Sequence, residues 1–143
     1  MQQWASRSAF HKFCLLVGAC ALLPLVLCGA EKSEAAYQEL AQKAAKGDLS
    51  IDFRALRLAC AQADHCDPAG DSKDVIAMRR AAQSNDFQEA VKMAEKLIAV
   101  GFPNIEAHAA CAEGYQRLGQ TDKASFHHDI TAALIRSIME TGD

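Results

Sequence analysis

The sequence predicts an all-α fold in which antiparallel helix hairpins stack as a short solenoid. Apolar residues recur at helical spacing along most of the chain, and no stretch alternates with a period of two for long enough to form a strand. The sequence also repeats internally: Asp52-Phe53 recurs as Asp86-Phe87 thirty-four residues later, and Ala90 recurs as Ala124 at the same offset. A helix pair cannot cover its own apolar face, so about three pairs are needed for a stable stack.

Residues 1–30 are predicted to be a secretory signal peptide. Basic Arg7 and Lys12 precede the apolar run Phe13–Leu27, and small residues follow at Cys28-Gly29-Ala30. The apolar run has fifteen residues, whereas a membrane-spanning helix needs about 20. We therefore expect an exported protein, periplasmic or at the cell envelope, whose membrane contact is limited to the signal or to a lipid anchor.

Two processing routes fit this signal. Cys28-Gly29-Ala30 resembles a cleavage site that ends at Ala30, whereas the segment ending at Cys28 resembles a lipoprotein box with Cys28 as the lipidated residue. Leu27 stands where lipoprotein signals usually have a small residue, which favours cleavage after Ala30. Residues 31–143 are then expected to form a single helical domain.

The composition of residues 31–143 argues against nucleic acid as a partner. This part holds thirteen basic and eighteen acidic residues, a net charge of −5, whereas phosphate backbones require a basic face. It also holds three cysteines, too few for a disulfide scaffold. Cys60 and Cys66 could pair in an oxidising compartment, which would leave Cys111 as a small buried residue.

Helix start and stop signals divide the domain into six segments. Ser33 is a candidate N-cap of the first helix, Asp52 of the second and Asn104 of the fifth, while Asp86 with Glu89 forms a capping box at the start of the fourth. The third helix is the least regular, and the sixth starts at Thr121. The predicted helices cover residues 34–46, 53–63, 73–84, 87–100, 105–118 and 121–138.

Residues 73–140 resemble the tetratricopeptide repeat family. The resemblance rests on residues 85–104, which start with Asn85-Asp86-Phe87-Gln88-Glu89-Ala90, and on Ala107, Ala112, Tyr115, Gly119 and Ala124. It implies that the first helix of each pair lines a concave face that binds a peptide or protein segment. The residues that the resemblance places on this face are Arg79, Gln83, Glu106, Glu113, Gln116 and Arg117. They could equally form an ordinary solvated surface.

The whole domain also resembles a family of small exported bacterial proteins known only as a domain of unknown function. The matching segments are Gly47–Phe53 with Leu56-Arg57, Leu118–His127, and Ser137-Ile138 before Thr141-Gly142-Asp143. Members of that family continue beyond this Gly-Asp, so the resemblance implies a C-terminally shortened member. It implies no activity.

The sequence predicts no catalytic residue and no cofactor, because it has no phosphate loop, nucleophile elbow or metal-ligand spacing. The leading hypothesis is therefore a non-catalytic protein-interaction module. The competing hypothesis is a metal-binding or thiol-redox protein that uses His108, Cys111 and His128. In the repeat register Cys111 and His128 are expected in helix packing, and His108 is expected to be packed or half-exposed.

Overall fold

Six helices make up the computed structural model, which describes residues 24–140 and 142. Within that part of the chain there is no strand, so the predicted all-α class is confirmed. The helices are α1 (Pro24–Ala45), α2 (Phe53–Gln62), α3 (Ser72–Gln83), α4 (Phe87–Val100), α5 (Ile105–Arg117) and α6 (Thr121–Met139). Among the described residues, no helix is both long and apolar enough to span a bilayer.

The first helix starts earlier than predicted. α1 begins at Pro24, so Ser33 lies inside the helix and the prediction that it is an N-cap was wrong. Proline is favoured in the first turn of a helix, and the residues around Ser33 are good helix formers, so nothing local stops the helix there. The predicted signal peptide falls largely on residues 1–23, which lie outside the described residues, and side chains are described from Lys32 onward.

Side-chain caps fix the starts of four helices. Asp52 accepts a hydrogen bond from the backbone N–H of Ala55, Asp86 from that of Glu89, and Asn104 from that of Ala107. Asp71, a cap that the sequence analysis did not single out, does the same for α3. The predicted starts of α2, α4 and α5 are therefore confirmed.

The turns α3–α4 and α5–α6 have the same geometry thirty-four residues apart. The N–H of Asp86 donates to the Ala81 carbonyl at 2.9 Å, and the N–H of Gln120 donates to the Tyr115 carbonyl at 2.9 Å. The residue before each donor has positive φ, 59° at Asn85 and 73° at Gly119. Both turns therefore close with the bond pattern of a left-handed helix C-cap.

Helices α3 to α6 each pack against the next, and α3 also contacts α5 across α4. Their shared core is built around Met78, Leu97, Cys111 and Tyr115, none of which is more than 5% exposed. Small residues permit the close approaches: Gly114 of α5 faces Val91 and the carbonyl of Phe87 on α4. α3 and α5 therefore touch each other directly in addition to their contacts with α4.

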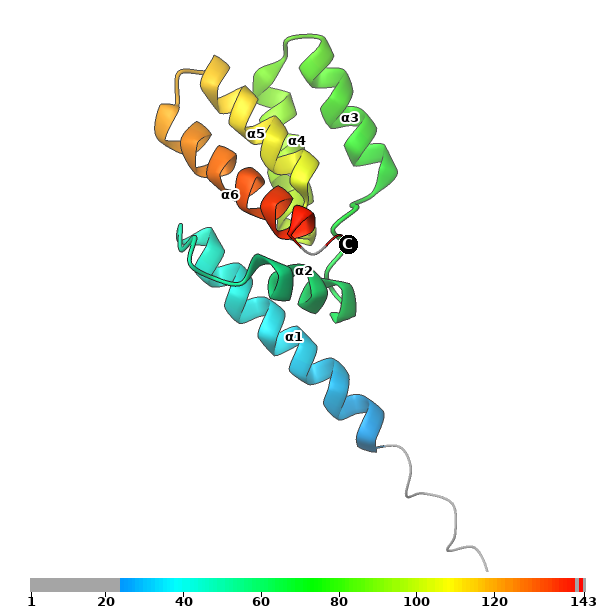
Figure 1. Ribbon diagram of the computed structural model, residues 1–143. Helices are drawn as coiled ribbons and strands as arrows, with labels where there is room; N and C mark the ends of the chain where they lie inside the picture. Colours follow the sequence, from blue (N-terminus) through cyan, green and yellow to red (C-terminus); the bar gives the residue numbers. More distant parts are fainter. Residues whose placement is uncertain (1–23, 141, 143) are drawn as a thin grey trace, which may run out of the picture.

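The N-terminal hairpin does not extend the array in chain order. α1 packs on α2, and α2 packs against α6, so that Figure 1 shows the hairpin on one side of the α3–α6 array. Arg57 of α2 donates a hydrogen bond from Nε to the Ser137 hydroxyl of α6 at 3.0 Å. The expectation that three hairpins stack in sequence order is therefore not met by the first hairpin, because the linker after α2 carries it to α6 instead.

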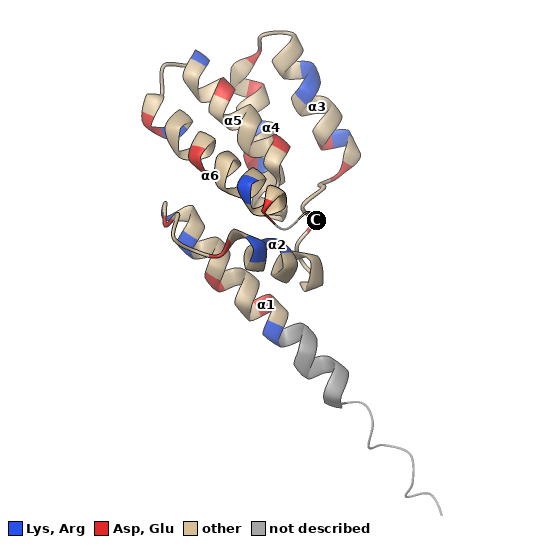
Figure 2. Cartoon of the chain, viewed as in Figure 1, with Lys and Arg blue, Asp and Glu red and all other residues tan. Residues whose placement is uncertain are grey.

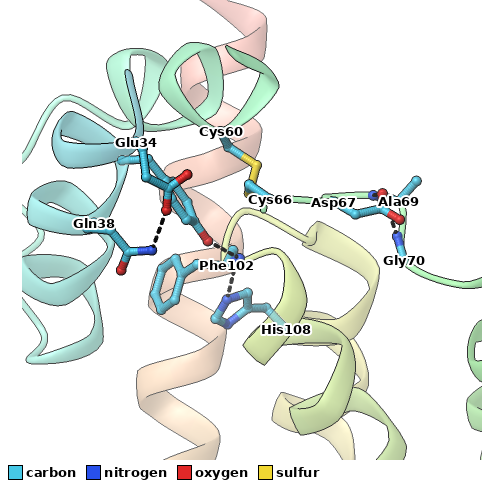
Figure 3. Close-up of a disulfide and its surroundings, with 10 residues drawn as sticks. Glu34, Gln38, Cys60, Cys66, Asp67, Ala69, Gly70, Phe102 and His108 are labelled. Atoms are coloured by element: carbon cyan, nitrogen blue, oxygen red, sulfur yellow. Dashed lines mark hydrogen bonds between the residues drawn. A yellow bond between two sulfur atoms is a disulfide. The ribbon is translucent and has the colours of Figure 1, made fainter. Parts of the chain in front are cut away.

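That linker is fastened at both ends. Cys60 and Cys66 form a disulfide, which settles the pairing that the sequence left open (Figure 3). The next residue, Asp67, donates its backbone N–H to the Val100 carbonyl, and its carboxylate accepts from the N–H groups of Ala69 and Gly70. The N-terminal hairpin is thus tied to the end of α4 as well as to α6.

Candidate interaction groove and buried histidine pair

A groove runs along α3 and α5. One part, with a volume of about 230 Å³, has a floor of Met78, Ala82 and Ala109 among other small or apolar residues. A second part, of about 670 Å³, lies at the starts of the two helices and is lined by apolar Val75, Ile76, Pro103 and Ile105. Arg79 and Glu106 line both parts and lie at the boundary between them.

An ion pair connects the two helices across this groove. Arg79 of α3 binds Glu106 of α5 with both of its donor groups, Nη2 lying 2.7 Å from Oε2. The hydrogen bond from Arg79 is the largest cause that lowers the pKa of Glu106; burial opposes it, and the positive charge of Arg79 adds a smaller lowering effect. Both side chains remain about half exposed, at 58% and 44%, so solvent screens the pair and it contributes little to stability.

The six predicted partner-binding residues fall into two groups. Arg79, Glu106 and Glu113 line the groove. Gln83, Gln116 and Arg117 are exposed but line neither part of it. Arg117 instead lies 3.7 Å from Glu113 and 5.5 Å from the centre of the Phe87 ring. Half of the predicted face therefore surrounds one groove.

Charge is spread over the surface rather than gathered by sign. Acidic and basic residues both occur on each of α3 to α6 in Figure 2. Most ion pairs among the described residues are local, such as the pairs that Lys92 makes with Glu89 and Lys43 with Glu39.

The three residues of the metal or redox hypothesis do not converge. His108 and Cys111 are fully buried, whereas the His128 side chain is 77% exposed and lies beside Asp129. The prediction that His128 is in helix packing was wrong, and His127 occupies that place. Burial, with a smaller effect of Glu95, raises the pKa of the Cys111 thiol to about 12. Among the described residues, no three His, Cys, Asp or Glu side chains gather where they could hold a metal ion.

His108 and His127 form a buried hydrogen-bonded pair. Their Nδ1 atoms lie 3.0 Å apart. Nε2 of His108 lies 2.9 Å from the carbonyl oxygen of Phe102, and Figure 3 shows these two residues. Burial, and then the neighbouring His127, lower the pKa of His108 to about 4, and burial is also the largest cause that lowers the pKa of His127. Both rings are therefore neutral near pH 7.

The hydrogen bonds determine the tautomers of this neutral pair. A carbonyl only accepts, so Nε2 of His108 carries its proton and Nδ1 of His108 has the lone pair. Nδ1 of His127 must then donate, which leaves Nε2 of His127 as an acceptor. No described residue hydrogen-bonds to that Nε2 atom, and the atom is not completely buried. It is therefore open to a ligand or to solvent.

The histidine pair lines a pocket of about 470 Å³ that, among the described residues, shares no lining residue with the groove. α1 forms one wall with Tyr37 and Gln38, and the C-terminal half of α4 forms another with Glu95 and Ile98. The Tyr37 hydroxyl accepts a hydrogen bond from the N–H of Phe102 at 3.1 Å, which joins α1 to the α4–α5 turn. The N-terminal hairpin thus completes the pocket.

His127 and Glu95 were not among the predicted site residues. A signal for His127 existed, because it lies three residues from both Ala124 and Ile130, on the apolar stripe of α6 that continues to Leu134. Glu95 had no local signal: it accepts a short hydrogen bond from the Tyr115 hydroxyl, twenty residues away. Such a pairing depends on how α4 and α5 pack.

Comparison with known proteins does not assign a function. No protein-family model matches the chain, and neither the curated proteins nor the solved structures gave a match.

Proposed function

We propose that this protein is an exported, non-catalytic interaction module whose α3–α5 groove binds an extended segment of another protein in the periplasm or at the cell envelope. The observation that carries the proposal is the groove itself, which has an apolar floor and a charged rim formed by Arg79, Glu106 and Glu113. Export rests on the sequence of residues 1–30.

The tetratricopeptide-like architecture is part of this proposal. The two turns with equal hydrogen bonds thirty-four residues apart, at Asn85 and Gly119, support a repeat of two helix pairs. The contact between α3 and α5 supports it too, since the first helices of successive pairs would share one face. In such a stack the shared face is concave and accepts a chain segment.

The length of the groove suits a short extended segment. On α5 the lining residues run from Ile105 to Gly114, a distance of about 14 Å at about 1.5 Å per residue. That length matches roughly four residues of extended chain at about 3.3 Å each.

Selection from a displayed library of random heptapeptides tests this proposal. Peptides selected on the protein would be measured by fluorescence anisotropy against wild type, Ala109→Trp and Ser125→Trp. Ala109 is an exposed residue of the groove, and Ser125 is an exposed residue of α6 outside it. We expect binding at least about tenfold weaker for Ala109→Trp, or about 1.4 kcal/mol, and unchanged for Ser125→Trp. Equal affinity for Ala109→Trp and wild type, or no enriched peptide, would refute the groove as the binding site.

A further inference from the structure

The pocket beside the histidine pair has the features of a small-molecule site that is separate from the groove. Its volume of about 470 Å³ lies within the usual range of ligand pockets, about 300–1,000 Å³. Phe102, Phe126 and Ile98 give it an apolar and aromatic lining. The groove lies on α3 and α5, so neither site depends on the other.

Two of the residues that line this pocket offer hydrogen-bond acceptors. Nε2 of His127 is a lone-pair acceptor, as the hydrogen bonds of the neutral histidine pair require. Glu95 contributes a carboxylate, which takes one hydrogen bond from Tyr115 and has lone pairs left over. The two acceptors are neighbours, because the Tyr115 ring stacks on the His127 ring at 5.7 Å while its hydroxyl donates to Glu95.

One negative charge lies at the pocket. Glu95 is the only carboxylate among the described residues that line it. The ammonium group of Lys123 lies nearby, 4.7 Å from the centre of the Tyr115 ring, and, after burial, its charge helps to lower the pKa of His127, so the attraction of Glu95 for a bound cation acts against repulsion from Lys123. Gln38 and Gln42 of α1 supply amide oxygens at the pocket wall, and a primary ammonium has three N–H groups to share among such acceptors.

We propose that this pocket binds a small organic amine in its protonated form, with the ammonium group donating hydrogen bonds to the Glu95 carboxylate and to Nε2 of His127. The carbon body of the amine packs against Phe102, Phe126 and Ile98. Recognition therefore needs three things together: a positive charge, an N–H group and an apolar body.

Calorimetric titration of the full chain with three matched probes separates these requirements. Phenethylamine has all three features, 2-phenylethanol lacks the charge, and benzyltrimethylammonium has the charge but no N–H group. We expect phenethylamine to bind at least about tenfold more tightly than either of the others, as the loss of a charge-assisted hydrogen bond predicts. Equal affinity for the alcohol or for the quaternary ion would overturn the proposal, as would no binding of phenethylamine at millimolar concentration.

Three variants test whether phenethylamine binds in this pocket. Glu95→Gln keeps an oxygen that accepts from Tyr115 but removes the charge, so phenethylamine affinity should fall about tenfold. Ala99→Trp places a large ring on an exposed pocket residue and should block binding without disturbing the core. Glu113→Gln in the groove is the matched control and should bind like wild type. Circular dichroism would verify that each variant is folded, and unchanged affinity in both Glu95→Gln and Ala99→Trp would refute the site.

Discussion

The buried histidine pair should make the protein less stable in mild acid. His108 has a pKa of about 4 in the folded protein against 6.5 for a free histidine, a difference that corresponds to about 3 kcal/mol. The pKa of His127 is lowered in the same direction. Between these pH values the unfolded chain binds more protons than the folded protein. The free energy of unfolding therefore falls as the pH drops from about 6.5 toward 4, and the stabilising effect is complete above about 6.5.

Urea unfolding measured from about pH 7 to about pH 4 tests this prediction. His108→Gln is the informative variant, because a glutamine can donate to the Phe102 carbonyl and accept from His127 but does not titrate. We expect wild type to lose up to about 3 kcal/mol more than His108→Gln over this range. His128→Gln, at an exposed position, should behave like wild type. If His108→Gln keeps the wild-type pH dependence, the loss of stability in acid does not come from protonation of buried His108.

Three further predictions concern packing, the disulfide and a cap. Gly114→Ala should destabilise wild type by about 1–2 kcal/mol, because its methyl group would overlap Val91, but should be stabilising by up to about 1 kcal/mol in a Val91→Ala background. The same sign in both backgrounds would contradict the close approach. Replacing Cys60 and Cys66 together by alanine should cost about 2 kcal/mol, the loop-closure value for their separation of six residues. A reductant should destabilise wild type only; an equal effect on the variant would argue against the disulfide. Asn104→Ala removes a buried cap and should cost about 1–2 kcal/mol in thermal unfolding, and an unchanged melting temperature would show that the cap is dispensable.

Local chemistry explains which helices could be predicted. Asp86 and Asn104 cap their helices with side-chain hydrogen bonds that span three residues, so the starts of α4 and α5 are encoded within a few positions. The start of α1 was predicted wrongly because the prediction also relied on a local cap signal, and here that signal was misleading. Ser33 had the chemistry of a cap, but its flanking residues favour helix on both sides, and its hydroxyl instead donates to Gln62 of α2.

The candidate sites depended on contacts between distant residues, and these were only partly predictable. The repeat register predicted Arg79 and Glu106 for one face, and both residues line the same groove, although their role in binding stays a prediction. It could not show that they pair with each other over twenty-seven residues. For the histidines, a one-residue error in the register of α6 exchanged exposed His128 for buried His127.

The position of the N-terminal hairpin determines which parts of the α3–α6 array remain open as candidate binding sites. Had α1 and α2 stacked on α3 in chain order, they would have lengthened the face that α3 and α5 form. Tyr37 is instead hydrogen-bonded to Phe102, and α2 lies against α6, so the hairpin meets the array at α6 and at the α4–α5 turn. There its apolar residues share one core cluster with Phe102, Ile130 and Leu134, and α1 forms one wall of the histidine pocket. No described residue of α1 or α2 lines the α3–α5 groove, so the site proposed for a chain segment and the site proposed for a small amine have different lining residues.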